Sequence, residues 1–127
     1  MSMLIDTDVL IEYLRGNPAV VENFTAAYAE GKHLCFSPVT KAEIIAGLRK
    51  GEEEITKRLF GLMKCLAIND RIGEKAGHYI KTYQASHNVE IADALIAATA
   101  GENSMPLWTL NKRHYPMKDI DLFEIRS

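Results

Sequence analysis

Short apolar runs alternate along the chain with longer stretches in which apolar residues recur every three or four positions. The short runs indicate strands, whereas the recurring pattern indicates helices with one buried face. Strands are predicted over residues 3–5, 33–36, 65–68, 107–110 and 122–125. Helices are predicted over about 9–14, 18–30, 38–48, 52–64, 70–86 and 89–100, the last of them capped by Asn88.

Strands that are separated by helices pair in parallel through right-handed crossovers. The pattern therefore predicts a three-layer α/β/α sandwich with a central, mostly parallel sheet of about four to five strands. We expect a single domain over residues 1–127, since repeats and linker-like segments are absent from the sequence. Ligands of such folds collect at the carboxyl ends of the strands, where Asp6 and Asn111 are expected.

Composition limits the classes of function. The formal net charge of −2 argues against a generally basic nucleic-acid binder, so any contact with nucleic acid must be local. No apolar run is long enough to span a bilayer or follows the plan of a signal peptide, and we expect a soluble, cytoplasmic protein with no membrane contact. Cys35 and Cys65 lack the spacing of a zinc site and are interpreted as reduced thiols in the core.

Asp6 stands at the start of a predicted helix, and Glu43 lies inside another. Asp6 directly follows an apolar strand, which places its carboxylate at the sheet edge, although Asp6 or Asp8 can equally serve as a helix cap. Glu43 follows a helix start at Ser37-Pro38 and is expected to be half-buried and free to point into a site. The alternative for Glu43 is a capping box with Thr40, which carries no catalytic meaning.

Asp93 lies in an otherwise almost wholly apolar helix, and a buried charge needs a partner. Glu90 lies three residues earlier and shares a helix face with it, so the two charges repel unless a cation or the helix N-terminus offsets them. The alternative is an exposed acidic face on the first turns of the helix. Small residues at Ala94 and Ala97 allow another element to approach this face closely.

Three carboxylates that converge raise one another's pKa values unless a divalent cation neutralises them. An all-oxygen site suits Mg²⁺ or Mn²⁺ rather than zinc. Such an ion can activate a water and clamp the phosphate in an in-line displacement, which points to phosphodiester hydrolysis. The convergence of Asp6, Glu43 and Asp93 is an inference from the predicted fold, because their separation in sequence does not demonstrate it.

Four segments taken in order carry a resemblance to a known family. They are LIDTDVLI at 4–11, SPVTKAEI at 37–44, DALIAA at 93–98 and LWTLNKRHY at 107–115. Through them essentially the whole chain resembles the PIN-domain ribonucleases, and most closely the bacterial VapC-type toxins of toxin–antitoxin pairs. The resemblance implies a Mg²⁺- or Mn²⁺-dependent endoribonuclease, usually a homodimer, that cuts structured RNA such as tRNA or rRNA and is silenced by a cognate antitoxin.

The resemblance also implies roles for individual residues. Asp6, Glu43 and Asp93 match the three acidic metal residues of the family, and Asn111 falls at a fourth position that is often aspartate. An asparagine keeps an oxygen ligand there but removes one negative charge. Asp8 is interpreted as an acid that contacts and orients the metal ligands without binding the metal itself.

Further polar residues adjoin the expected site. Thr7 and Thr109 can donate hydroxyl hydrogen bonds to carboxylate or phosphate, with turn capping as the alternative. Lys112, Arg113 and His114 follow the site directly and can receive RNA phosphates, with a solvated loop as the alternative.

Two other functions fit parts of the sequence. A haloacid-dehalogenase-like phosphatase would use Asp6 as a covalent nucleophile, and a catalytically inactive RNA- or protein-binding module of the same fold is hinted at by Asn111. The expected antitoxin would place a helix in an apolar groove formed by the helices over 18–30 and 52–64. Complete packing of both helices within the monomer would count against that groove.

Overall fold

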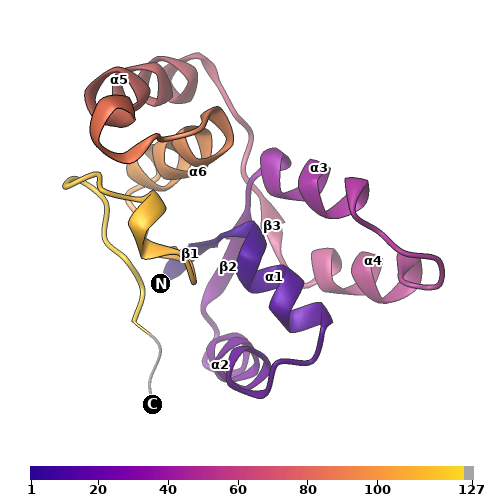
Figure 1. Cartoon of the computed structure of the whole chain (residues 1–127). Coiled ribbons are helices and arrows are strands. Elements are labelled where there is room, and N and C mark those ends of the chain that lie inside the picture. Colours follow the sequence, from indigo (N-terminus) through magenta and orange to yellow (C-terminus); the bar gives the residue numbers. More distant parts are fainter. Residues whose placement is uncertain (125–127) are drawn as a thin grey trace.

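The structure, a computed structural model, describes residues 1–124 and has a four-stranded parallel sheet at its centre (Figure 1). The strand order is β3-β2-β1-β4, and the register places Leu4 of β1 beside Cys35 of β2 and Leu107 of β4. The strands are β1 Ser2–Ile5, β2 His33–Phe36, β3 Lys64–Cys65 and β4 Leu107–Trp108. This arrangement confirms the predicted α/β class with a parallel central sheet.

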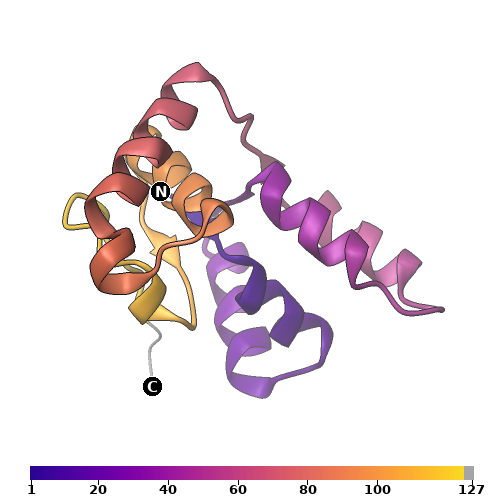
Figure 2. The ribbon, with the colours of Figure 1, turned by 45° about the horizontal axis from the view of Figure 1, so that its top comes forward.

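Helices cover both faces of the sheet. They are α1 Thr7–Leu14, α2 Pro18–Ala29, α3 Pro38–Ala46, α4 Glu53–Gly61, α5 Asp70–His87 and α6 Ile91–Glu102, followed by a short 3-10 helix, η1, at Lys112–His114. Helices α5 and α6 pack against each other on one side of the sheet, while α1 and α2 lie on the other (Figures 1 and 2). The pair α3–α4 extends to one side of the molecule (Figure 2).

The alternation of strand residues explains the two halves of the core. Leu4, Cys35 and Leu107 face the buried cluster that α5 and α6 complete. Their sequence neighbours Ile5 and Trp108 face the opposite cluster, which contains the apolar residues of α1, α2 and α4. Successive strand residues point to opposite faces, so each short strand contributes to both cores.

Several predicted strands are shorter in the structure. The helix predicted over 52–64 ends at Gly61, and the strand predicted over 65–68 is reduced to Lys64–Cys65, the two residues that pair with β2. The strand predicted over 107–110 ends at Trp108, and the N–H of Leu110 donates instead to Asp8 of α1 at 3.2 Å. The strand predicted over 122–125 consists of one bridge, from Leu107 to Leu122, and residue 125 lies outside the described part.

Two further expectations were wrong. Asn88 does not cap α6; it is the C-terminal cap of α5 in the left-handed conformation, with φ 50°. Asparagine tolerates that conformation, so one residue type serves both kinds of helix end. Cys65 is exposed on the edge strand rather than part of the core, whereas Cys35 is buried as expected.

Among the described helices none has both the length and the apolar character needed to cross a bilayer.

Candidate acidic centre

Asp6 lies at the carboxyl edge of the sheet, between the end of β1 and the first turn of α1. Its main-chain N–H donates to the carbonyl of Trp108 at 2.9 Å, which fixes the residue to β4. The side chain is buried, and its Oδ1 accepts the N–H of Thr7 at 2.8 Å. Asp6 therefore caps α1, as one interpretation of the sequence required, and still directs its second oxygen into the site.

The second oxygen of Asp6 accepts two hydroxyl hydrogen bonds. Thr109 donates to Oδ2 at 2.8 Å, and the hydroxyl of Tyr115 donates to the same atom at 2.9 Å. Both donors come from the segment after β4, 103 and 109 residues away in the sequence. Together with the bond from Thr7, these hydrogen bonds hold the Asp6 side chain in one orientation.

Asp93 approaches Asp6 from the first turn of α6. Its Oδ1 lies 3.4 Å from the hydroxyl of Tyr115, and its Oδ2 lies 3.5 Å from Nδ1 of His114. Burial raises the pKa of Asp93 above its usual range, and His114 opposes that rise. The negative charges of Asp6 and Glu43 add to the rise, so these carboxylates act on one another electrostatically.

Glu90 contributes charge rather than contact. It is the N-terminal cap residue of α6, is exposed and makes no side-chain capping hydrogen bond. Its negative charge is one of the influences that raise the pKa of Asp93. The predicted proximity of the two acids is therefore present, without direct hydrogen bonding between Glu90 and the other acids of the site.

Glu43 reaches the centre from α3 through a hydroxyl. Its Oε1 accepts a hydrogen bond from Thr7 at 2.7 Å, and the Thr7 oxygen lies 3.0 Å from the hydroxyl oxygen of Thr40. Thr7 has one hydroxyl proton, which it donates to the carboxylate, so Thr40 donates to Thr7. The N-terminal cap of α3 is Ser37, whose Oγ accepts the N–H of Val39, and the capping box between Thr40 and Glu43 is not formed.

The burial predicted for Glu43 was wrong, since the residue is exposed. Its neighbour Ile44 is buried, but Ile45 is 52% exposed, so the apolar stretch around Glu43 only partly faces the core. A glutamate with an exposed stem can change rotamer easily. The Thr7 hydroxyl is the contact that now directs it toward the site.

Asp8 is the least satisfied acid of the group. Its Oδ2 accepts the N–H of Leu110 at 3.2 Å and lies 3.4 Å from the Thr109 hydroxyl, while its buried Oδ1 has no hydrogen-bond partner among the described residues. Burial and the adjacent negative charge of Asp6 raise the pKa of Asp8 to about 6. Burying a carboxylate oxygen without a hydrogen-bond partner costs free energy, and binding of a cation or a proton would lower that cost.

The donor chemistry of this acidic centre, made of Asp6, Asp8, Glu43 and Asp93, fits a hard divalent cation. All its ligand atoms are oxygens, and in residues 1–124 no lysine or arginine makes an ion pair with these four acids. No three His, Cys, Asp or Glu side chains of the described part lie close enough together to form a complete metal site. Closing such a site requires side-chain movement, which the exposed Glu43 allows.

Asn111 and the basic residues lie beside the acidic centre. The main-chain N–H of Asn111 donates to the Thr109 hydroxyl at 3.0 Å, and its exposed side chain lines a cavity of about 850 Å³. The same cavity is lined by Lys112, Arg113 and His114. Asn111 is therefore linked to the acidic centre through its main-chain bond to Thr109, which itself donates to Asp6.

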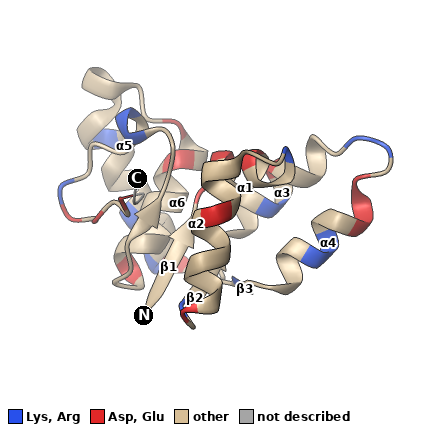
Figure 3. Cartoon of the chain, turned by 90° about the horizontal axis from the view of Figure 1, so that it is seen from below, with Lys and Arg blue, Asp and Glu red and all other residues tan. Residues whose placement is uncertain are grey.

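Charge is distributed unevenly around this cavity and the acidic centre. Acidic stretches of the ribbon gather where α1, α3 and α6 approach one another (Figure 3). Lys112 is paired with Glu124, with Nζ 2.6 Å from the carboxylate, and both side chains are at least half exposed. An exposed pair of this kind is weak and can be exchanged for a phosphate.

Two residues of the centre were missed in the sequence. Thr40 was considered only as a possible capping residue, and Tyr115 ended a motif without being given a role. The available signal for Tyr115 was chemical, since a buried tyrosine hydroxyl needs a hydrogen-bond partner. Its burial, however, depends on packing that no local pattern reveals.

Comparison with known proteins gives consistent matches over most of the chain. A family profile described as "PIN domain" matches residues 3–120. The chain is 38% identical to "Ribonuclease VapC10" of Mycobacterium tuberculosis, over 91% of this chain and 86% of that protein. It is 31% identical to "Ribonuclease VapC19" of the same species, over 90% of this chain and 92% of that protein.

Solved structures show the same fold. VapBC from Salmonella typhimurium, solved bound to DNA, has a chain that aligns with a TM-score of 0.80 at 20% identity, covering 97% of each chain. FitAcB from Neisseria gonorrhoeae aligns with a TM-score of 0.73 at 28% identity, covering 96% of each chain.

Proposed function

The chain belongs to the PIN-domain family, and from this premise we propose that it is a divalent-metal-dependent endoribonuclease, the toxin of a type II toxin–antitoxin pair. The observation that carries the proposal is the acidic centre, in which the pKa values of Asp8 and Asp93 are raised and no lysine or arginine of the described residues compensates the charge. Relatives of 38% and 31% identity are named ribonucleases.

Asp6, Glu43 and Asp93 are the residues proposed to hold Mg²⁺ or Mn²⁺. When bound, the ion would supply a water of lowered pKa and charge stabilisation at the scissile phosphate. Thr7 would keep the Glu43 carboxylate directed inward, and Thr109 would keep that of Asp6 oriented. These hydroxyls act before any substrate arrives, because their hydrogen bonds are already formed.

The RNA strand is proposed to cross the cavity beside the acidic centre. Lys112, Arg113 and His114 line this cavity and can contact phosphates on either side of the cleaved bond, while Asn111 at its mouth can orient the substrate. The formal net charge of −2 makes such a local basic patch necessary for binding a polyanion. Structured RNA, such as tRNA or rRNA, is the proposed substrate.

A cognate antitoxin is the proposed protein partner, and solved relatives include complexes described as VapBC and FitAcB. The two helices predicted to form its groove are not fully packed within the monomer, since Tyr28 of α2 and Ile55 of α4 are each 51% exposed. The cavity of about 430 Å³ that is lined by Ile45 and Phe60 lies between α3 and α4, rather than between the predicted pair α2 and α4. A homodimer and a cytoplasmic location complete the proposal.

The phosphatase interpretation, with Asp6 as nucleophile, is disfavoured by the family match over residues 3–120. The inactive-module interpretation is separated from the nuclease by experiment. Partner-free protein is incubated with a labelled tRNA and rRNA pool with Mg²⁺, with Mn²⁺ and with EDTA, beside Asp6→Asn. The exposed acid Asp70, in the first turn of α5, provides the matched control Asp70→Asn.

We expect cleavage by wild type and Asp70→Asn only when metal is present, and a loss of at least about 100-fold in Asp6→Asn. Asparagine can still cap α1, so the loss is not expected to reflect unfolding. Cleavage that survives EDTA or Asp6→Asn would contradict the proposal. RNA binding without cleavage in every variant would identify an inactive module.

A further inference from the structure

Tyr115 is a buried residue whose two ends have different environments. Its ring belongs to the buried cluster that α5 and α6 form with one face of the sheet, and only 4% of the residue is exposed. Its hydroxyl emerges from that cluster into the acidic centre, 2.9 Å from Asp6 Oδ2 and 3.4 Å from Asp93 Oδ1. The packed ring therefore fixes where the hydroxyl sits between two carboxylates.

The hydrogen bonds of Asp6 leave it little freedom. A carboxylate oxygen has two acceptor positions, and those of Oδ2 are occupied by Thr109 and Tyr115. Oδ1 accepts one bond, from Thr7, and keeps one acceptor position open. Rotation of this carboxylate would break three hydrogen bonds, so its open position points in a fixed direction.

Asp93 lies beside this arrangement and is held less tightly than Asp6. One of its oxygens lies 3.4 Å from the Tyr115 hydroxyl oxygen, and the other lies 3.5 Å from Nδ1 of His114. Because a phenol has one hydroxyl proton and Tyr115 donates it to Asp6 at the shorter distance, the tyrosine fixes Asp6 directly and only adjoins Asp93. The tyrosine hydroxyl is the one described group that contacts both carboxylates.

We infer that Tyr115 is a positioning residue of the acidic centre, whose buried hydroxyl donates its one proton to Asp6 and fixes that carboxylate beside Asp93, so that a divalent cation meets an oriented ligand. The inference rests on the proposed function, since it concerns the affinity of that site for metal. Hydrogen-bond partners behind metal ligands commonly change metal affinity by about 10–100-fold when they are removed.

The Tyr115 hydroxyl can change metal affinity in either of two opposite directions. If the hydroxyl merely competed with a cation for Asp6, its removal would strengthen metal binding. Tyr115→Phe separates the two cases, because phenylalanine keeps the ring in the core and removes only the hydroxyl. The sign of the change in affinity is therefore decisive.

The chain offers a matched control in Tyr79. This residue lies in the same buried cluster, 7% exposed, and its hydroxyl also donates to an aspartate, Asp119, at 2.8 Å. Tyr79→Phe removes an equivalent hydrogen bond away from the acidic centre. Any loss of affinity that follows from general loosening of this cluster should appear in both variants.

The experiment is calorimetric titration of the purified, partner-free protein with Mn²⁺, alongside melting temperatures in EDTA. We expect Tyr115→Phe to bind Mn²⁺ about tenfold more weakly than wild type and Tyr79→Phe to bind within about twofold of it. Unchanged or tighter binding by Tyr115→Phe, or an equal loss in Tyr79→Phe, would overturn the positioning role while leaving the proposed function intact. A wild type that binds no Mn²⁺ would overturn the metal site and this inference together.

Discussion

Tyr79 and Tyr115 belong to one buried cluster, and each donates a hydrogen bond from its hydroxyl to an aspartate, but the two aspartates have opposite electrostatic surroundings. Asp119, the partner of Tyr79, also lies 2.8 Å from the ammonium of Lys75. Asp6, the partner of Tyr115, has acids as its charged neighbours, and no lysine or arginine within residues 1–124 pairs with it.

The pKa directions follow from this difference. Partial burial alone would raise the pKa of Asp119, but hydrogen bonds from Lys75 and Tyr79 outweigh it and bring the pKa below its usual range. In the acidic centre, burial raises the pKa values of Asp8 and Asp93, and neighbouring acids add to the rise. The fold pairs Asp119 with a lysine, whereas Asp6 and its acidic neighbours pair with no lysine or arginine of residues 1–124.

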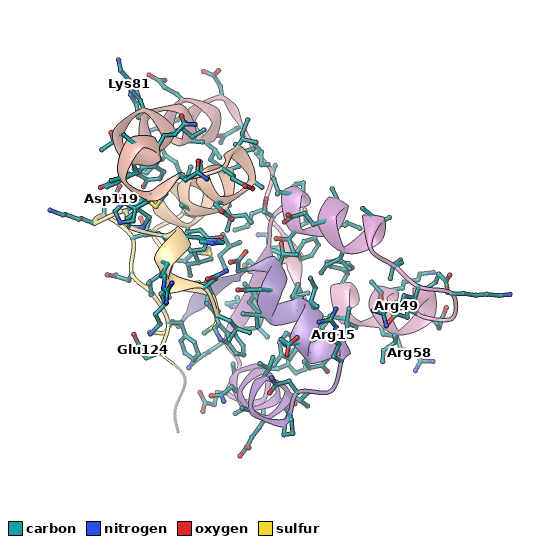
Figure 4. All side chains as sticks on the ribbon, in the orientation of Figure 1. Arg15, Arg49, Arg58, Lys81, Asp119 and Glu124 are labelled. Carbon is teal, nitrogen blue, oxygen red and sulfur yellow. The ribbon has the colours of Figure 1, made fainter. Side chains whose placement is uncertain are left out.

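The neutralised pair is also built into the packing. A Cβ at Gly101 of α6 would lie 2.7 Å from Cε of Lys75 and 3.2 Å from the Tyr79 hydroxyl, so a larger residue there would push the end of the lysine side chain aside. The labelled view places Asp119 close to α5, on the far side of the molecule from Arg15, Arg49 and Arg58 (Figure 4). Asp119 thus has a lysine partner, whereas the acids of the acidic centre pair with no lysine or arginine of the described residues and have only His114 beside Asp93, which supports a role for an external cation there.

The largest expected difference between the acidic centre and the Tyr79–Asp119 pair is in RNA cleavage. Asp93→Asn keeps the shape of the side chain but removes a charge that the ion would need. A bound ion contributes several kcal/mol of transition-state stabilisation, so we expect the cleavage rate to fall by at least about 100-fold. Asp119→Asn should stay within about twofold of wild type. Initial rates at saturating Mg²⁺ measure both, and similar losses in the two variants would remove the functional distinction.

A smaller effect, of opposite sign in the two regions, is expected on stability. In EDTA, Asp93→Asn relieves repulsion among acids and should raise the melting temperature by about 3 °C, as expected for about 1 kcal/mol in a domain of this size. Asp119→Asn weakens a half-exposed ion pair and should lower it by about 3 °C. Scanning calorimetry measures both, and shifts of the same sign would show that the acidic centre is not electrostatically strained.

Much of the fold was predictable because its signals are local. Apolar runs and helical periodicity placed the four strands of the described sheet near their observed positions, although the fifth predicted strand is a single bridge. An acid directly after a strand, as at Asp6, lies at the carboxyl edge of a parallel sheet. Local signals are ambiguous at helix ends, however. Asn88 suits either an N-terminal cap or a left-handed C-terminal cap, and the structure uses the second.

The hydroxyl contacts of the site were not predictable in the same way. The bond from Tyr115 to Asp6 spans 109 residues, and that from Tyr79 to Asp119 spans 40. Such contacts depend on how α5, α6 and the last segment pack, which periodicity does not specify. The same packing places Tyr79 beside Asp119, which pairs with Lys75, and Tyr115 beside Asp6, which pairs with no lysine or arginine of the described residues.

The smallest expected effect is a pH dependence of stability that runs in opposite directions in the two regions. The pKa of Asp8 is raised from 3.8 to about 6 by burial and by the charge of Asp6, so the folded protein binds more protons than the unfolded chain between those values. Stability from Asp8 therefore falls as the pH rises through this window. Asp119 has a lowered pKa, so its contribution is present above 3.8 and is lost as the pH falls through the folded-state pKa.

Melting temperatures in EDTA, from about pH 4 to about pH 7, can separate these contributions. Relative to wild type, Asp8→Asn should gain about 2 °C across this range as the wild-type carboxylate ionises, an estimate reduced for solvent screening of a partly exposed group. Asp119→Asn should instead keep a nearly constant deficit over this range, because the contribution of wild-type Asp119 is already present above 3.8 and is lost only at lower pH. If the melting temperatures of wild type and Asp8→Asn instead change in parallel with pH, the Asp8 carboxylate is already stabilised in the folded protein. The contrast between the Tyr115–Asp6 and Tyr79–Asp119 pairs would then lose its electrostatic basis.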